Sequence, residues 1–169
     1  MQTGYVNGAY QSMAGVTVDA AYRRPIGRFG DLDIGLRYFR LREERASATG
    51  LVTANTAAQI GSPRDSVQLD LGWEKGRWGV AWQTHYTSAQ PYDRGFTADS
   101  RDVLELNADY THNLSARFRW RDATDFRLSV TNLLDGEPPF PIGAEAFNGN
   151  YDFLGRRYSL SIAHKFGGR

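Results

Sequence analysis

Apolar and polar residues alternate one by one along most of the chain. A period of two predicts β-strands with one apolar and one polar face, and helical periodicity is nearly absent. Seven segments carry the alternation, at residues 16–23, 32–38, 67–73, 78–83, 104–110 with a continuation to 120, 126–130 and 158–163. We predict an all-β fold, an antiparallel up-and-down meander of about seven strands, or eight if the first 24 residues divide into two. The unbroken parity from Val6 to Val16 favours one long first strand.

The connections between these segments are alternately short and long. The short ones are residues 24–30, 74–77 and 121–125, and the long ones are about 43–65, 88–101 and 135–155. In an antiparallel meander, every second connection lies at the same end of the sheet, so short turns gather at one end and long loops at the other. Bacterial outer-membrane barrels have this arrangement, with short periplasmic turns and long external loops.

Three further features favour a strand face that meets lipid. Aromatic residues stand beside the short turns on the apolar face, where an interfacial girdle would lie. They are Tyr22, Trp73, Trp78, Trp120 and Phe126. The polar face carries charged side chains well inside the strands, and the apolar face is free of charge through its middle, where a charge would cost about 2–4 kcal/mol. Two alternatives remain open: ordinary aromatic cross-strand pairs, and a soluble lipocalin-like barrel with its apolar face turned inward.

Length, charge and cysteine content narrow the possibilities. The 169 residues suit one domain, the net charge of +1 gives no basic field for nucleic acid, and the absence of cysteine excludes disulfides and thiolate sites. No apolar run approaches the roughly 18 residues of a spanning helix. The opening MQTGYVNGAY lacks the basic and apolar regions of a signal peptide, so an exported chain would be a piece of something longer or its mature part.

No catalytic constellation stands out, and we predict neither an enzyme nor a metal or cofactor site. The three histidines lie far apart on predicted strands. Some carboxylates have a spacing that could serve general acid–base chemistry, but arginines such as Arg37 and Arg127 are their expected partners on the polar face. The carboxylates are Asp31 with Asp33, and Glu105 with Asp109.

Candidate ligand contacts lie in the long loops. The stretch AQPYDRGFTADSRD offers aromatic rings and guanidinium groups that can stack on and ion-pair with an anionic or aromatic ligand, and FNGNYDF offers amide and phenol groups. The predicted contacts are Tyr92, Arg94, Phe96, Arg101, Asn148 and Tyr151. The alternative is that these residues only pack neighbouring loops. Asn132 and Asp135, at the end of a predicted strand, are expected to satisfy loop backbone donors.

The chain contains the stretches DFRLSVTNLLDGEPPF and NYDFLGRRYSLSIAHKF near its end and YVNGAYQSMAGVTVDAAYRR near its start. These stretches resemble parts of a TonB-dependent outer-membrane receptor, and the resemblance covers nearly the whole chain, strong over residues 125–166 and loose elsewhere. DFRLSVTNLLDGEPPF is similar to the penultimate strand of that family, which closes on N-L-[FL]-D followed by prolines. NYDFLGRRYSLSIAHKF is similar to its last strand, which follows Y-D-x-x-G-R-x-[YF]. The matching residues are Asn132, Leu133, Leu134 and Asp135, then Tyr151, Asp152, Gly155, Arg156 and Tyr158, and finally Phe166.

This resemblance implies that residues 1–169 are a single segment, the C-terminal portion of a receptor β-barrel whose plug domain is not in this sequence. Such receptors import scarce nutrients, for example ferric siderophores, across the outer membrane of Gram-negative bacteria. The implied partners are outer-membrane lipid, the remaining strands and plug, the TonB complex acting through the plug, and a small ligand such as a metal chelate. A small self-contained barrel with a structural or adhesion role is the alternative.

Overall fold

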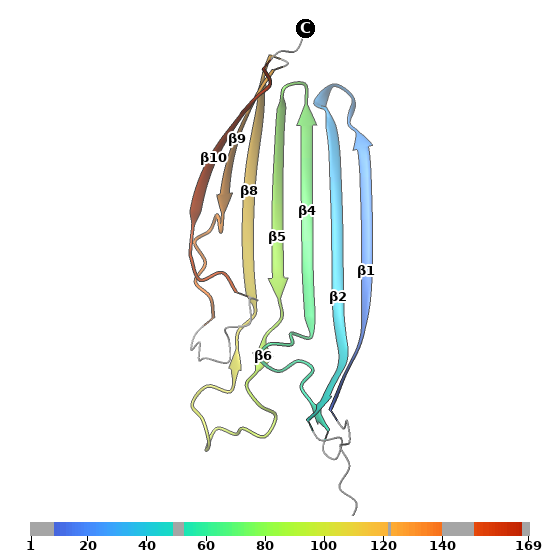
Figure 1. The fold of residues 1–169 in the computed structure, drawn as a ribbon, viewed down its shortest axis with the longest axis vertical. Coiled ribbons are helices and arrows are strands. Elements are labelled where there is room, and N and C mark those ends of the chain that lie inside the picture. The colour runs from blue at the N-terminus through green and yellow to red at the C-terminus, as the bar shows by residue number, and fades with distance from the viewer. Residues whose placement is uncertain (1–8, 49–52, 122, 140–150, 167–169) are drawn as a thin grey trace, which may run out of the picture.

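The computed structural model describes residues 9–48, 53–121, 123–139 and 151–166. Its main sheet is an antiparallel meander in the order β1-β2-β4-β5-β8-β9-β10 (Figure 1). These strands are β1 (Tyr10–Pro25), β2 (Asp31–Ser47), β4 (Asp65–Lys75), β5 (Trp78–Thr87), β8 (Asp109–Trp120), β9 (Thr124–Thr131) and β10 (Arg157–His164). The predicted all-β meander of seven strands is confirmed. Among the described residues, no helix is both long and apolar enough to cross a membrane.

The register of the sheet keeps apolar and polar side chains on opposite faces. One row aligns Tyr22, Ile34, Leu71, Trp82, Leu114, Val130 and Tyr158 across the seven strands. The adjacent row, one residue along, aligns Arg23, Asp33, Gly72, Ala81, Ser115, Ser129 and Ser159. Because neighbouring residues of a strand point to opposite faces, the first row lies on an apolar face and the second on a polar face.

In the described part of the chain, no second layer packs on the apolar face. Leu128 and Leu160 are paired neighbours on β9 and β10, and 50% and 69% of their surface is exposed. Buried hydrophobic residues are instead found near the long loops, where Leu106 and Tyr151 form a small cluster. The sheet therefore presents a broad apolar surface that needs a partner or an apolar solvent.

Short turns and long loops are segregated to opposite ends, as the sequence predicts. The turn between β1 and β2 contains the 3-10 helix η1 (Gly27–Phe29), and β4 and β5 are joined by Gly76 and Arg77 alone. These turns and the last residues of β10 lie together at the top of Figure 1. The connections that follow β2, β5 and β9 lie at the bottom and are longer.

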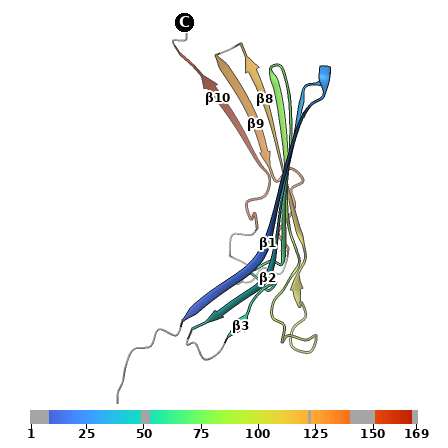
Figure 2. The same ribbon diagram turned by 90° about the vertical axis from the view of Figure 1, so that its right-hand side faces the viewer.

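The sheet is twisted and is not closed in the described residues. β1 pairs only with β2, and β10 pairs only with β9. Figure 2, turned by 90° from the first view, shows the strands crossing, so that β10 and the β1–β2 turn diverge at the short-turn end. β1 and β10 are the first and last of seven alternating strands, and they therefore run in the same direction.

The hairpin of β1 and β2 extends further than the alternation indicates. β2 continues to Ser47 through a charged stretch, and the register shifts by a β-bulge between Ala14 and Gly15. A Cβ at Gly15 would lie 2.9 Å from the Phe39 ring and from the Arg40 carbonyl oxygen, so glycine permits the close approach of the two strands. β1 and β2 therefore stay paired on both sides of the bulge, although the residues of β2 beyond it no longer alternate between apolar and polar.

The predicted strand from residue 104 to 120 is wrong in its first part. Residues 105–106 form β7 (Glu105–Leu106), which pairs with β6 (Gln90–Pro91) in a separate small sheet, and β8 begins at Asp109. A further short strand, β3 (Ala54–Asn55), pairs with the end of β2. The alternation of apolar and polar residues continues from β7 into β8, so it does not separate the two strands. Leu106 fits this alternation because it is fully buried among the loops, and not because it lies on the apolar face of the main sheet.

Candidate functional site

The chain leaves β9 through a turn centred on Asn132. The Asn132 side chain donates to the Gly136 carbonyl oxygen at 2.8 Å and accepts from the Gly136 N–H at 3.0 Å. The Asn132 N–H donates to Oδ1 of Asn113 on β8 at 3.0 Å. Asn132 and Asp135 have φ of 52° and 56°, a left-handed backbone that Asn and Asp adopt more readily than most residues. Their expected role in satisfying loop backbone groups is confirmed.

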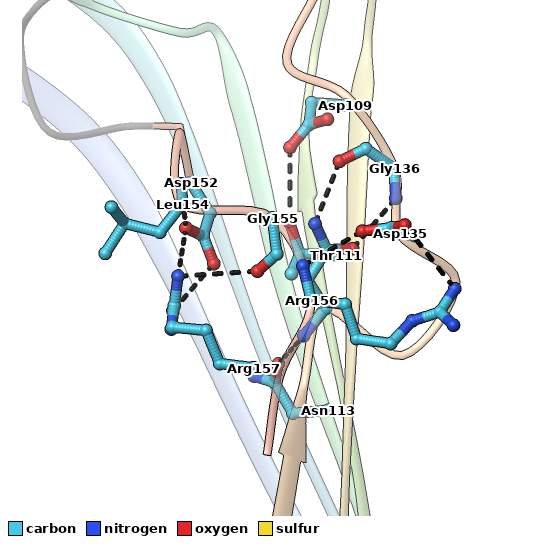
Figure 3. A network of polar contacts seen from close by, with 11 residues as sticks. Asp109, Thr111, Asn113, Asp135, Gly136, Asp152, Leu154, Gly155, Arg156 and Arg157 are labelled. Carbon is cyan, nitrogen blue, oxygen red and sulfur yellow. Dashed lines mark hydrogen bonds and ion pairs between the residues drawn. The ribbon is translucent and has the colours of Figure 1, made fainter.

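Asp135 connects this turn to the start of β10 (Figure 3). Its Oδ1 accepts the Arg156 N–H at 2.9 Å. The next residue in the chain, Arg157, donates two N–H groups to the two oxygens of Asp152, at 2.7 and 2.8 Å. These hydrogen bonds from Arg157 hold the pKa of Asp152 below its usual range. The two segments of the C-terminal motif, far apart in sequence, therefore meet in one polar network at the long-loop end.

Tyr151 anchors this network to the other loops. Only 7% of Tyr151 is exposed, and it forms a buried cluster with Leu106 against which Ile60 and Tyr92 pack. The fully buried Gln90 donates to the Tyr151 hydroxyl at 2.6 Å and accepts the Gly61 N–H at 3.0 Å. Burial, and after it the charge of the nearby Asp109, raises the pKa of Tyr151.

The structure brings four of the predicted ligand contacts into one loop cluster. The Arg101 guanidinium lies 3.4 Å from the centre of the Tyr92 ring and 5.7 Å from that of Phe96. Tyr92 in turn packs against the cluster that contains Tyr151. We call this group of Tyr92, Phe96, Arg101 and Tyr151 the loop platform. Its cation and its rings can contact an anionic or aromatic ligand, since 42% of Phe96 is exposed.

The other two predicted contacts are placed differently. Arg94 donates to the Ala57 carbonyl oxygen at 2.7 Å, so its side chain joins one loop to another. Asn148 lies outside the described residues. The Tyr151 hydroxyl is already bonded to Gln90. Arg101 is the charged residue of the loop platform. The platform therefore combines loop packing with a half-buried cation and an exposed ring.

A second polar network crosses the polar face of the sheet. Asp70 on β4 accepts from Gln68 at 2.8 Å and from Gln83 of β5 at 2.7 Å. Gln83 then accepts from Asn113 of β8 at 3.2 Å. A hollow of about 690 Å³ lies over this part of the sheet and is lined by Asp33, Asp70, Gln83 and Asn113. The sequence analysis missed this network because its pairs depend on register.

Two of the four carboxylates weighed for acid–base chemistry, Asp33 and Asp109, have partners on their own or a neighbouring strand. Asp33 pairs with Arg23 on the neighbouring strand, and Asp109 accepts from the Thr111 hydroxyl at 3.4 Å. Arg37 does meet a carboxylate across the polar face, but the partner is Asp19, at 2.7 Å. Strand register decides these pairs, because Arg23 lies opposite Asp33 and Asp19 lies opposite Arg37.

His85 and His112 lie one residue apart in register on the paired strands β5 and β8, so their side chains point to opposite faces of the sheet, and His164 lies on β10. His85 bonds to Gln83 at 2.8 Å, His112 to Thr84 at 3.0 Å and His164 to Thr124 at 2.8 Å. Within the described ranges, no group of three or more His, Cys, Asp or Glu side chains could hold a metal ion. Comparison of the chain with protein-family models, curated proteins and solved structures gives no match.

Proposed function

We propose that this chain is the C-terminal part of the β-barrel of a TonB-dependent outer-membrane receptor, which imports a scarce nutrient such as a ferric siderophore. The observation that carries the proposal is the polar network of the C-terminal motif. Asn132 and Asp135 from one half of the motif, and Asp152 and Arg156 from the other, converge where β9 ends and β10 begins. This contact between the two halves of the motif supports the proposal.

The apolar face supports a location in the membrane. Trp78 lies 4.4 Å from Phe118 at the short-turn end, and Tyr86 lies 4.8 Å from Tyr110 at the long-loop end. Residues 78–86 of β5 separate these two aromatic pairs, which fits the roughly 9–11 residues that a tilted strand needs to cross the hydrocarbon core. Aromatic residues at both borders of an apolar band are typical of outer-membrane barrels.

The open edges support a larger barrel over a self-contained one. An open edge is untenable in lipid, because its backbone groups find no partner. β1 and β10 run in the same direction, so an antiparallel barrel requires an odd number of further strands between them. Under the proposal, the remaining receptor chain supplies these strands together with the plug, through which the TonB complex would act.

The polar face then lines the lumen and the long loops face outward. Asp70, Gln83 and Asn113 offer hydrogen-bonding groups to a plug or to water in the lumen. Arg101 and the rings of the loop platform are available to a ligand that arrives from outside, such as a negatively charged metal chelate. The proposal involves no reaction catalysed by this chain.

A pair of adjacent residues on β9 tests the membrane location. The chain has no cysteine, so Leu128→Cys and Ser129→Cys can each carry a single fluorophore. In micelles that contain brominated phosphatidylcholine, we expect strong quenching at position 128, on the apolar face, and weak quenching at position 129. Equal, weak quenching at both positions would indicate a soluble barrel and contradict the proposal.

Whether the isolated chain forms a closed barrel tests the proposal that it is part of a larger receptor barrel. We expect the isolated chain to lack the heat-modifiable electrophoretic migration of a closed barrel, because the seven-stranded sheet needs further strands. Heat-modifiable migration of the 169-residue chain alone would favour a self-contained barrel instead. At the gene level, the proposal expects an upstream coding region for a plug and further strands; a complete gene with its own signal peptide and no plug would contradict it.

A further inference from the structure

Exposed cations gather at the short-turn end of the sheet. Among the described residues, none of them forms an ion pair with a carboxylate. They are Arg24, Arg28, Lys75, Arg77, Arg121 and Lys165. Hydrogen bonds bring the turns together: the Arg119 N–H donates to the Arg77 carbonyl oxygen at 2.8 Å, and the Lys165 N–H donates to that of Ala123, also at 2.8 Å. We call these six side chains the basic rim.

Three of the four described carboxylates at this end pair with other arginines, and the fourth, Asp31, forms no ion pair with a described residue. Arg23 pairs with Asp33, Arg117 with Glu74 at 3.0 Å, and Arg119 with Asp125 at 3.3 Å. These three pairs lie on the polar face. Among the described residues, the six cations of the basic rim outnumber the one unpaired carboxylate at this end, Asp31. Arg24 extends the positive charge onto the apolar face, because it lies in the row of Leu32 and Trp73.

Aromatic rings accompany the basic rim. The Arg28 guanidinium lies 4.9 Å from the centre of the Phe29 ring, and that of Arg121 lies 5.9 Å from the Trp120 ring. Phe29 and Trp120 are both more than half exposed. A long cationic side chain beside an exposed aromatic ring is suited to a membrane interface, where the ring lies at headgroup level and the charge reaches toward water.

We propose that the basic rim binds the phosphate groups of anionic phospholipids in the leaflet at the short-turn end. The inference rests on the proposed function, which places that end at the periplasmic side of the membrane. The cations adjoin the apolar face and its aromatic border, so one molecule can place its acyl chains on the face and its headgroup at the rim. This continuity favours a lipid over an acidic protein, which would not need the apolar face.

Binding of dansyl-labelled lipids in neutral-detergent micelles tests the inference. Tryptophan fluorescence is transferred to dansyl-phosphatidylglycerol or, for comparison, to dansyl-phosphatidylcholine. The double variant Arg28→Gln/Arg77→Gln removes two charges from the basic rim. The matched control, Arg42→Gln/Arg64→Gln, removes two exposed charges near the long loops. All four positions are exposed, and circular dichroism verifies that strand content is retained.

We expect phosphatidylglycerol to bind at least tenfold more tightly than phosphatidylcholine. At about fivefold per charge, the rim variant should weaken phosphatidylglycerol binding roughly 25-fold, while the control changes it less than twofold. Inorganic phosphate at the same concentration should not displace the lipid. Equal binding of the two lipids, or equal losses in both variants, would overturn the inference and would fit an acidic protein partner or a general charge effect.

Phase separation in a detergent that clouds on warming distinguishes a failure of the basic-rim inference from a failure of the proposed membrane location. A chain that enters the detergent phase but shows no preference for phosphatidylglycerol contradicts only the basic rim. A chain that stays in the aqueous phase contradicts the membrane location, and the inference fails with it. Entry into the detergent phase together with the lipid preference supports both.

Discussion

The two ends of the sheet hold their backbone in different ways. Of the four left-handed positions described at the short-turn end, three are glycines, Gly27, Gly30 and Gly76, and the fourth is Arg121. At the long-loop end, Asn132 and Asp135 adopt similar φ values and use their side chains to bond neighbouring backbone.

This difference indicates which changes each end can tolerate. A tight turn depends on the absence of a side chain, because there is no room for one or the backbone angle disfavours it. A long loop depends on the presence of particular side chains, because they replace the hydrogen bonds that a strand would supply. Substitutions at the two ends should therefore act by opposite mechanisms, one by adding atoms and the other by removing them.

Adding one methyl group at Gly30 should have the largest effect. A Cβ there would lie 2.2 Å from the Glu74 carbonyl oxygen, and φ is +102°. We expect Gly30→Ala to destabilise the chain by about 3 kcal/mol or more, because the β1–β2 turn must move away from β4. Urea unfolding in detergent micelles, followed by circular dichroism, measures the change.

Gly76 is the matched control for this substitution. Its φ of +58° is also left-handed, but a Cβ would meet no atom within 4 Å. Gly76→Ala should therefore lower the free energy of unfolding only through the unfavourable backbone angle, by about 1–2 kcal/mol. Similar losses in both variants would mean that contact between η1 and β4 does not define the short-turn end.

Removing a side chain at Asn132 should have the next largest effect. Asn132→Ala loses both hydrogen bonds to Gly136 and leaves a non-glycine residue at a φ of 52°, so we expect a loss of about 2–3 kcal/mol. Asn132→Gly loses the same bonds but tolerates the backbone angle, and it should lose roughly 1 kcal/mol less. Equal stability of the two variants would mean that the left-handed backbone at Asn132 does not affect the free energy of unfolding.

Much of the fold follows from the sequence because alternation is a local property. The seven strands, the two faces and the segregation of loops all follow from parity and spacing, as at Leu128 and Val130. The bulge at Gly15 and the separate pairing of β7 with β6 do not, because they depend on contacts between segments far apart in the chain.

The candidate site was harder to predict for the same reason. The residue types at Tyr92 and Arg101 suggested that both could stack on a ligand, whereas in the structure the two residues stack on each other. Nothing near Gln90 in the sequence indicates that it is buried and bonds Tyr151, which lies 61 residues further on. Likewise, only the register shows that Arg37 pairs with Asp19 and not with Asp33.

The bond between Gln90 and Tyr151 provides a smaller test of the long-loop end. Tyr151→Phe keeps the ring but leaves the buried Gln90 amide without its acceptor, and we expect a loss of about 1.5 kcal/mol in urea unfolding. Tyr22→Phe, at a residue 52% exposed, should be almost neutral. An equally neutral Tyr151→Phe would mean that water replaces the hydroxyl, and that the loop cluster is held by apolar packing alone.

The pair of Asp152 and Arg157 should give the smallest effect, visible mainly in its pH dependence. Because hydrogen bonds from Arg157 lower the pKa of Asp152 in the folded chain, the unfolded chain takes up this proton first as the pH falls. The pair therefore stabilises the fold fully above the unfolded pKa of about 3.9, and this contribution is lost as the pH falls further, through the folded pKa. Asp152→Asn should have a lower urea midpoint than the parent chain at pH 7, and the difference should shrink below about pH 4. Asp99→Asn, at an exposed carboxylate, serves as the control and should follow the parent. A constant difference between Asp152→Asn and the parent at every pH would mean that the charge of Asp152 does not stabilise the long-loop end.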